Sequence, residues 1–387
     1  MTGALSPILV TNRAANYSNH HMVEGLHEGF QALGCNSQLH LIGQDGTGLD
    51  AFLEALPDPT SEQGQNSFLV DLNARMRLPQ TALYKKFSFI TDHPFALLEQ
   101  ILAAPPKTIL GYVDRSHATF LDALQLPHRR VFFPHGGPET DSNPHPIENR
   151  TVDAMFIGRL DHSPRLADLK EGLKGNPAPI PRVVQQTAEQ SLAGLPLFEA
   201  FVAACNDANV DLKDFGLEGL KSCLSIASNW VEARRRHDIL TSMGKVKITL
   251  AGSVRSDFFE TTPPNIDFLG TIPFTDVQAK IRQAKLLLNV VGVFPDGSHE
   301  RIWYGMAAGC PILTERGNLL EEDFVDGESI FYWPDDLEQI NDFVSVLLAD
   351  PKRLEAAAAN ARPIYDKRHT WTQRAATILD SMAAADE

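Results

Sequence analysis

The sequence predicts an α/β protein made of two doubly wound, Rossmann-like domains that face each other across a cleft, with a helical insertion in the second domain. Short apolar runs alternate with helical patterns through residues 1–135, which indicates parallel strands joined by right-handed crossover helices. Residues 136–151 are rich in Pro, Gly, Asn and Asp and are typical of a linker. A second strand-and-helix series fills residues 152–370, and a chain of 387 residues is longer than one hydrophobic core usually serves.

The first domain opens with a buried strand in "SPILVTN", residues 6–12. The next segment places Met22, Leu26, Phe30 and Leu33 at helical spacing, and Gly34 is expected to end that helix. Helices are also expected in "HPFALLEQILAA" and "SHATFLDALQL". Further strands are predicted in "SQLHLIG", "SFLVDLN", "FSFITD", "TILGYVD" and "RVFFPHGG".

The second domain begins with the strand "VDAMFIGRL", and residues 161–243, which look mostly helical, then interrupt it. In that insertion, the charge run Glu232–Asp238 is interpreted as a solvated helix face. Strands resume in "KVKITLAGS", "NIDFLG", "KLLLNVV" and "ESIFYW", with a helix in "FTDVQAKIRQA". Helices finish the chain, and for residues 371–387 we consider a helix that packs back on the first domain.

The composition limits the classes of ligand. The formal net charge of -15 gives the chain no general attraction to nucleic acid or anionic lipid, so an anionic ligand needs a local basic or dipolar pocket. The four cysteines form no CxxC pair, which favours a reducing cytoplasm and excludes zinc-site spacing. No apolar run approaches the ~18 residues of a membrane span. We expect a cytoplasmic protein without a cofactor.

Ligands of such sheets bind beyond the carboxyl ends of the strands. Gly158 and Arg159 follow the strand "AMFI", where a glycine lets a ligand approach the backbone and an arginine suits phosphate; a surface Arg after a turn Gly is the alternative. Gly252 follows "ITLA" in the same way, and tight packing explains it about as well.

The stretch "DGSHERIWYGMAAGCPILT", Asp296–Thr314, is more informative. Ser298 is a candidate N-cap for a helix from about His299 to Ala308, with Gly309 as its stop. His299, Glu300 and Arg301 then lie in the first turn. An Arg there is unfavourable beside unpaired helix N–H groups unless an anion is near, which predicts a phosphate or diphosphate site. The alternative is that Arg301 points to solvent.

The first domain also carries polar side chains directly after its strands. Asp92 and His93 follow one strand, and either one can serve as a general base; the alternative is an Asp92 N-cap with a passive His93. Ligand contacts are predicted for Asn12, Arg13, His20, His21 and His135, with simple loop polarity as the alternative. The histidines are too dispersed to predict a metal site.

These motifs resemble the C-terminal half of GT-B glycosyltransferases of the glycosyl transferases group 1 type, and most closely the bacterial CgeB-like group. That group carries R-x-x-E-A-x-A-x-G-x-P, an acidic-Gly turn, a strand and a helix ending in L-A-D-P, and the segment from Arg301 onward shares this order of features, with Tyr304 and Gly305 in place of the E-A pair. "FIGR", "KITLAGS", "NIDFLGTIPFTDVQAKIRQAKLLLNV" and "FITDHP" add to the similarity. It covers roughly residues 152–382 and parts of the first domain.

The resemblance implies transfer of a sugar from a nucleoside diphosphate donor to a glycan, lipid or protein acceptor, without metal. By position, Arg159, Ser298, His299 and Arg301 would contact the diphosphate or the donor sugar. The first domain would then hold the catalytic group and the acceptor, and the ligand contacts predicted for it would be acceptor contacts. Tyr304 stands where these enzymes commonly carry a Glu that binds the ribose, and Glu300 lies one turn earlier. Two alternatives stay open: an inactive binding or scaffold protein, and a GT-B-like epimerase or phosphorylase.

Overall fold

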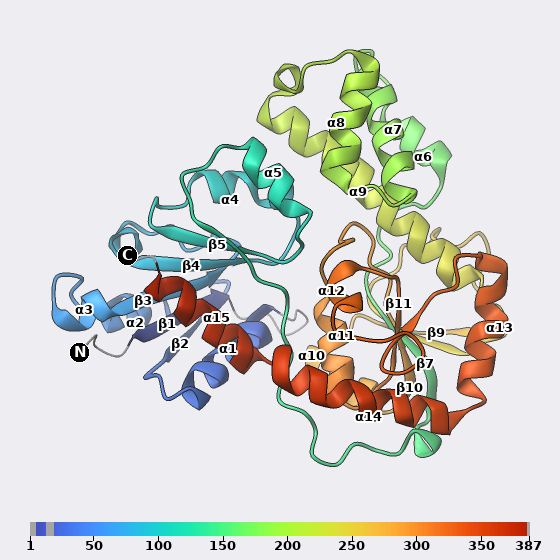
Figure 1. The fold of residues 1–387 in the computed structure, drawn as a ribbon. Coiled ribbons are helices and arrows are strands. Elements are labelled where there is room, and N and C mark those ends of the chain that lie inside the picture. The colour runs from blue at the N-terminus through green and yellow to red at the C-terminus, as the bar shows by residue number, and fades with distance from the viewer. Residues whose placement is uncertain (1–4, 13–18, 385–387) are drawn as a thin grey trace. The chain divides into compact units, whose positions relative to one another are not determined.

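The computed structural model describes residues 5–12 and 19–384 (Figure 1). The chain divides into two compact units, the first formed by Met1–Glu139 with Tyr365–Glu387 and the second by Thr140–Ile364. The first division falls inside the segment expected as a linker. Among the described residues, no helix is both long and apolar enough to cross a membrane.

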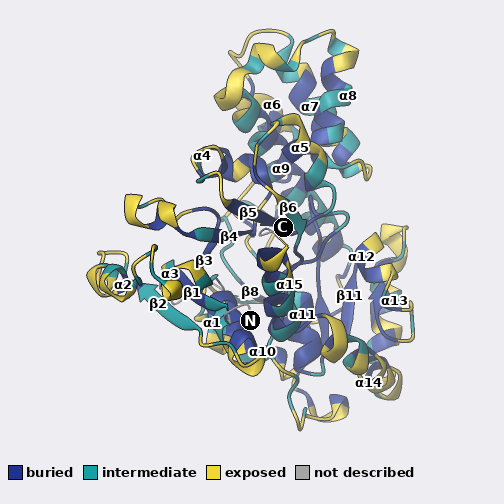
Figure 2. Ribbon diagram, turned by 60° about the vertical axis from the view of Figure 1, so that its left-hand side comes forward, coloured by how far each residue is buried: buried dark blue, intermediate teal, exposed yellow. Residues whose placement is uncertain are grey.

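The first unit contains a six-stranded parallel sheet in the order β2-β1-β3-β4-β5-β6. The central strands are buried because helices cover both faces, whereas the edge strand β2 is half-buried (Figure 2). The strands of this sheet are β1 (Ser6–Asn12), β2 (Gln38–Ile42), β3 (Ser67–Leu72), β4 (Lys85–Ile90), β5 (Thr108–Tyr112) and β6 (Arg130–Phe132).

The helices of the first unit are α1 (Asn19–Ala32), α2 (Leu49–Ala55), α3 (Glu62–Asn66), α4 (Leu98–Leu102), α5 (His117–Ala123) and α15 (Trp371–Ala383). Helix α1 buries Met22, Leu26 and Phe30, as its spacing predicts, and Gly34 follows with a φ of +80°.

Helix α15 packs against α1, although the two lie at opposite ends of the sequence. Two glycines of α1 make the close approach possible. A Cβ on Gly25 would collide with the Trp371 ring, and a Cβ on Gly29 would lie 2.7 Å from the Trp371 carbonyl oxygen. The Trp371 N–H also donates to the Gly137 carbonyl at 2.8 Å. The last helix is therefore an integral part of the first unit.

The second unit contains another six-stranded parallel sheet, in the order β12-β11-β10-β7-β8-β9. Its strands are β7 (Val152–Ile157), β8 (Ile248–Ala251), β9 (Ile266–Gly270), β10 (Ala284–Leu288), β11 (Ile312–Thr314) and β12 (Phe331–Tyr332). Its core includes Phe156, Leu250 and Leu288 from the central strands. The predicted α/β class with two doubly wound sheets is confirmed.

Four helices lie between β7 and β8, so the predicted helical insertion is also confirmed: α6 (Leu166–Gly172), α7 (Ile180–Leu192), α8 (Leu197–Ala208) and α9 (Gly216–Thr241). The longest, α9, packs on α7 and α8 and also contacts α13. The other helices are α10 (Phe274–Ile281), α11 (Glu300–Ala307), α12 (Asn318–Glu321), α13 (Leu337–Leu348) and α14 (Pro351–Arg368).

Candidate functional site

All strands of the second sheet are parallel, so the loops that follow β7, β8, β10 and β11 meet at one edge. The loop after β10 is held by Asn289, whose side chain is fully buried. Its Nδ2 donates to the Thr314 hydroxyl at 2.8 Å, which turns its Oδ1 toward the loop. That oxygen lies 3.0 Å from His299 Nδ1 and accepts from Arg301 Nη1 at 3.2 Å. Asn289 thus sets the positions of both side chains.

Arg301 lies in the first turn of α11 and has only neutral hydrogen-bonding partners. Within the described residues it forms no ion pair, and its buried Nε has no hydrogen-bonding partner. Burial lowers the pKa of Arg301, and the charges of Glu300, Arg236 and Glu232 act on it without direct contact. An arginine guanidinium stays charged in proteins, so a half-buried cation with a free Nε donor lies at this edge. The expectation that Arg301 lies at a helix N-terminus is correct, and the solvent-pointing alternative is not.

His299 is buried and its ring packs edge-on against Phe294, with 5.3 Å between the ring centroids. Its Nδ1 lies 3.0 Å from Asn289 Oδ1, a contact that needs a proton on Nδ1, and 3.3 Å from Arg301 Nη1, a contact that needs a lone pair on Nδ1. The two contacts therefore use different tautomers of the ring.

Ser298 is not the N-cap that the sequence predicts. Helix α11 starts one residue later, with His299 at the cap position and no side-chain cap bond. Ser298 is fully buried and its hydroxyl accepts from Trp303 Nε1 at 2.9 Å. The sequence pattern fitted a cap, but the indole of Trp303 competes for the same oxygen. At the other end of the helix, Gly309 has a φ of +63° and ends it as predicted.

The charge run on α9 is not a solvated face. Arg235 donates to the carbonyl oxygens of Gly292 and Ser191, each at 2.9 Å, and to that of Leu192 at 3.2 Å. Arg236 is buried, pairs with Glu232 at 2.9 Å and donates to the carbonyl of Arg159. The interpretation from sequence was wrong because α9 returns from the insertion to the edge of the sheet. Its arginines support the backbones of the loops after β7 and β10.

Glu315, directly after β11, completes this group of charges. Its Oε2 accepts from the Val291 N–H at 2.9 Å. Burial raises the pKa of Glu315, while that hydrogen bond and the cations Arg235 and Arg236 lower it. The sequence signal that could have found Asn289 and Glu315 is a polar residue at the end of an apolar strand.

Gly158 and Gly252 pack against each other, at the ends of β7 and β8. A Cβ on Gly252 would collide with the Gly158 carbonyl, and Gly252 has a φ of +143°, so only glycine fits there without strain. Packing alone thus explains Gly252. The Arg159 side chain is 75% exposed, with Nε 4.0 Å from Asp161 Oδ2, and so it is free to turn toward a ligand.

A cavity of about 660 Å³ opens at the ends of β8 and β9. Gly252, Ser253 and Arg255 line one part of it, and Phe259 and Phe268 supply aromatic surface.

Tyr304 is buried in α11, and its ring packs edge-on against Phe274 with centroids 5.1 Å apart. Glu300, one turn earlier, is half-buried in the first turn. Tyr304 therefore also fills space between α10 and α11.

In the first unit, the structure separates the two candidates for a general base. Asp92 is exposed at the end of β4, with Thr91 Oγ1 3.5 Å from its Oδ2. His93 is buried, and its Nδ1 accepts from the Phe95 N–H at 3.3 Å to cap the short 3-10 helix Pro94–Leu97. Burial lowers the pKa of His93 to about 3. The cap is therefore His93, whereas the alternative drawn from the sequence gave that role to Asp92 beside a passive histidine. Asp92 stays the predicted base.

The predicted acceptor residues do not form one group. Asn12 is exposed and helps to line a cavity of about 240 Å³ at the ends of β1 and β3, together with Asn19 and Asp71. His20 and His21 lie in the first turn of α1, and Arg13 lies outside the described residues. His135 is 3% exposed and packs against Phe89 with ring centroids 5.4 Å apart. Little of its ring is therefore open to an acceptor, and its role stays a prediction.

Comparisons with known proteins agree with this architecture. Residues 229–380 match a family described as glycosyl transferase-like. Sucrose-phosphate synthase from Thermosynechococcus elongatus has a similar structure, with a TM-score of 0.53, 10% identity and coverage of 99% of this chain and 100% of that one. HepE from Anabaena, solved with UDP and glucose, gives a TM-score of 0.53, 10% identity and coverage of 98% and 99%. T4 phage BGT, solved with its UDP-glucose substrate, gives 0.52, 14% identity and the same coverage.

No curated protein matches the sequence. The resemblance drawn from the sequence motifs is confirmed by the family match and by the architecture of these structures. The chain therefore has the fold of GT-B glycosyltransferases, and its residues 229–380 carry the sequence pattern of the glycosyl transferase-like family.

Proposed function

We propose that the chain is a glycosyltransferase that moves a sugar from a nucleoside diphosphate donor, bound by the second unit, to an acceptor hydroxyl, bound by the first. One observation carries the proposal. Arg301 is a half-buried cation at the edge where ligands of parallel sheets bind, and it has a buried, unpartnered Nε and no carboxylate partner among the described residues. Burying a cation without an anion is costly, so an anionic ligand is the natural partner.

The diphosphate is the anion that fits this place. It would accept hydrogen bonds from Arg301 and from the N–H groups at the start of α11, where the helix dipole also favours negative charge. Arg159 is exposed next to the same edge and would fold onto the ligand. As the bond from the anomeric carbon to the diphosphate oxygen breaks, these donors stabilise the charge on the leaving group, and no metal is required for that step.

The other donor groups follow from the same edge. The cavity of about 660 Å³ with Phe259 and Phe268 would take the nucleoside base. His299, at the start of α11, would contact a hydroxyl of the donor sugar. UDP-glucose is the first donor to test, because HepE was solved with UDP and glucose and BGT with UDP-glucose.

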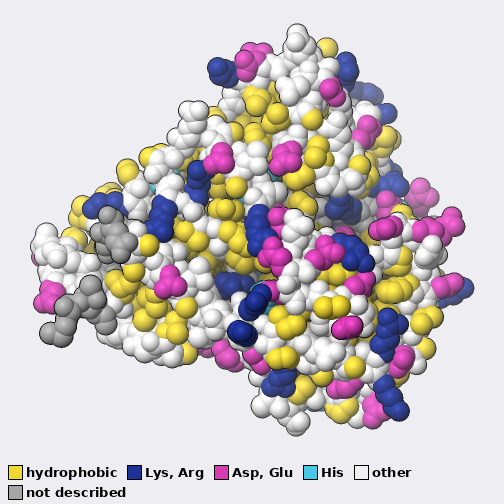
Figure 3. Space-filling view, in the orientation of Figure 1, with side chains coloured by type: hydrophobic (Ala, Val, Ile, Leu, Met, Phe, Trp, Pro, Cys, Tyr) yellow, Lys and Arg dark blue, Asp and Glu magenta, His cyan; other side chains and the backbone are white. Residues whose placement is uncertain are grey.

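In the first unit, Asp92 would take the proton of the acceptor hydroxyl as its oxygen bonds to the anomeric carbon. Nucleic acid is a poor acceptor for a chain with a net charge of -15. On the face shown in Figure 3, acidic and basic side chains are interspersed. We therefore place the acceptor among glycans, lipids and proteins.

The test is nucleotide binding by the full chain, measured by calorimetry with UDP, GDP, dTDP and CDP. We expect one of them to bind, and Arg301→Ala to weaken its affinity by about 2 kcal/mol, or roughly thirtyfold. Arg282→Ala is the matched control, because Arg282 precedes β10 at the opposite edge of the sheet and pairs with Asp141 at 3.4 Å. The control should bind like the original chain.

Equal affinities for the two variants would remove Arg301 from the donor site. Binding without sugar transfer would favour the inactive binding protein, for which Tyr304 is the supporting observation. Release of free sugar or sugar phosphate without an acceptor would favour the epimerase or phosphorylase.

A further inference from the structure

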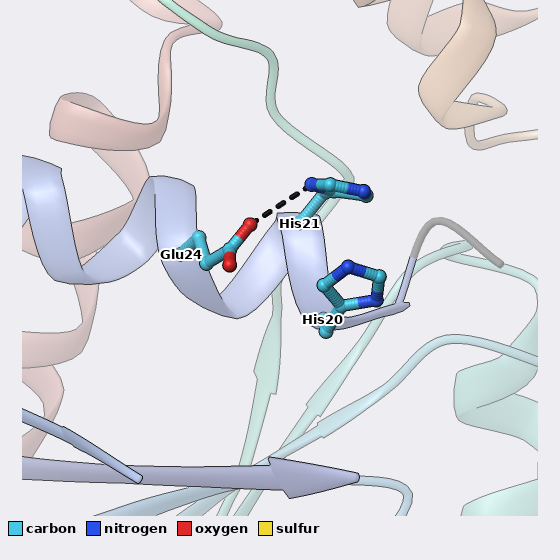
Figure 4. A group of neighbouring side chains, drawn as sticks. All are labelled: His20, His21 and Glu24. Carbon is cyan, nitrogen blue, oxygen red and sulfur yellow. Dashed lines mark ion pairs between the residues drawn. The ribbon is translucent and has the colours of Figure 1, made fainter. Parts of the chain in front are cut away.

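The first turn of α1 carries two adjacent histidines and a glutamate that the proposed donor chemistry does not use. Glu24 follows His20 by four residues and His21 by three, so helical geometry brings its carboxylate beside both rings. His20 is buried, and His21 and Glu24 are half-buried. Figure 4 shows the carboxylate directed at His21, with the ring of His20 next to it.

The distances describe a compact group. His21 Nδ1 lies 2.9 Å from Glu24 Oε2, and the centroids of the two imidazole rings are 3.9 Å apart with 38° between their planes. One ligand atom from each of the three residues lies within 4.8 Å of the other two. Imidazole nitrogens and carboxylate oxygens are both ligands of divalent metal ions, so the group offers three ligand atoms in a small space.

The ligand set suits a divalent ion of the zinc class. Two imidazole nitrogens and one carboxylate oxygen make a three-ligand site with an open fourth position. Zn–N and Zn–O distances near 2.0–2.1 Å place tetrahedral ligands about 3.4 Å apart, so the side chains must close by up to about 1.4 Å. Rotation of the half-exposed His21 and Glu24 provides that movement. The helix dipole disfavours a cation at this end, and the charge of Glu24 offsets it.

We propose that His20, His21 and Glu24 form a binding site for a zinc-class divalent ion in the first unit. The fourth coordination position of the ion would be left for a ligand from outside the chain. Asn19, the residue before His20, lines the cavity of about 240 Å³ together with Asn12, so an oxygen of a small polar molecule would complete the coordination. The site is separate from the diphosphate donors, which belong to the second unit, and it does not depend on the proposed function. The sequence analysis did not predict this site, because it considered the spacing of all the histidines along the chain and not the local group in α1.

Zinc alone is the probe that tests the site. The full chain, freed of metal, is titrated with Zn²⁺ against a chromophoric chelator, and we expect one ion per chain. Glu24→Gln and His21→Ala should each weaken the affinity at least about tenfold. Glu28→Gln removes a charge one turn further along α1, and His145→Ala removes an exposed histidine of the second unit, and both should bind as the original chain does. X-ray absorption of the zinc complex should show nitrogen and oxygen ligands with two imidazoles.

Absence of one-to-one binding, or equal affinities for Glu24→Gln and Glu28→Gln, would overturn the proposal. His20→Ala is not relied on, because His20 is buried and its loss can unfold the unit. Thermal melts of His21→Ala and Glu24→Gln without zinc establish that these variants are folded, so a loss of binding in them reports on the ligands.

Discussion

His93 is a neutral imidazole built into the first unit. Its Nδ1 accepts a backbone N–H, its ring lies 4.4 Å from the ring of His117, and burial lowers its pKa to about 3. An unfolded chain would protonate the same side chain near pH 6.5. Between those two values the unfolded state binds the extra proton, so stability is complete above pH 6.5 and falls as the pH is lowered toward 3.

The His93→Asn variant tests this linkage, because Asn also caps helices but does not titrate. Between pH 7.5 and pH 5.0 the original chain should lose about 2 kcal/mol more of its unfolding free energy than the variant. Hydrogen exchange of the β4 and β5 amides measures this in the first unit, and comparing the two chains at each pH cancels the intrinsic exchange rates. An equal loss in both chains would mean that His93 is protonated in the fold.

Sequence reasoning identified Arg301 and Gly309 because their positions follow from local rules of helix ends. It misplaced the cap at Ser298, since the partner that takes its hydroxyl, Trp303, is a side-chain contact of the folded loop. It missed Asn289 for the same reason. Asn289 contacts the side chains of Thr314, His299 and Arg301, and these contacts form only when the folded sheet brings the loops together. Local patterns indicate which residues cap or end a helix, whereas the hydrogen bonds between the side chains of a site depend on which loops the sheet brings together.

Helix α9 joins the insertion to the edge of the second sheet. Arg235 connects the end of α7 to the loop after β10 through three backbone carbonyl groups. Its position could not be predicted from the charge run, because the sequence does not say which side of a long helix meets another element. The helices of the insertion were predictable, since their apolar spacing is a property of each segment by itself.

Arg235→Met should destabilise the second unit by about 2 kcal/mol or more, because buried carbonyl groups lose charged donors. Arg234→Met is the matched control one residue away. Arg234 is 41% exposed and pairs with Asp238 at 2.8 Å, so its loss should cost less than about 1 kcal/mol. Unfolding in guanidinium chloride measures the stability of the two variants. Similar unfolding midpoints would show that the hydrogen bonds of Arg235 do not stabilise the second unit.

At the scale of the whole chain, the C-terminal helix is part of the N-terminal unit. The contact depends on Gly29, whose missing side chain leaves room for the backbone of Trp371 and Thr372. A sheet order and a helix count can be expected from the alternation of strands and helices. Which helix covers which face is harder to read, because the glycines of α1 carry no hydrophobic signal of their own.

Gly29→Ala and Gly219→Ala should change stability in opposite directions. An alanine at Gly29 meets backbone atoms that cannot rotate away, so overpacking should outweigh the gain in helix propensity and destabilise the first unit by about 1 kcal/mol. At Gly219 in α9 the nearest atom would lie 3.5 Å away, which leaves room, and the variant should be more stable by about 0.5–1 kcal/mol. Differential scanning calorimetry of the two variants gives the sign of each change in stability. A more stable Gly29→Ala variant would mean that α15 can move away from α1 at little energetic cost.

The packing of α15 on α1 determines when the first unit can finish folding during synthesis. A ribosome releases residues 1–139 early, yet the unit to which they belong also requires residues 365–387. Residues 140–364 must be translated in between, which takes roughly 10–45 s at ~5–20 residues per second. During that interval the nascent first sheet has the Gly25 and Gly29 surface uncovered, so the first unit is completed only after the residues of the second unit have been synthesised.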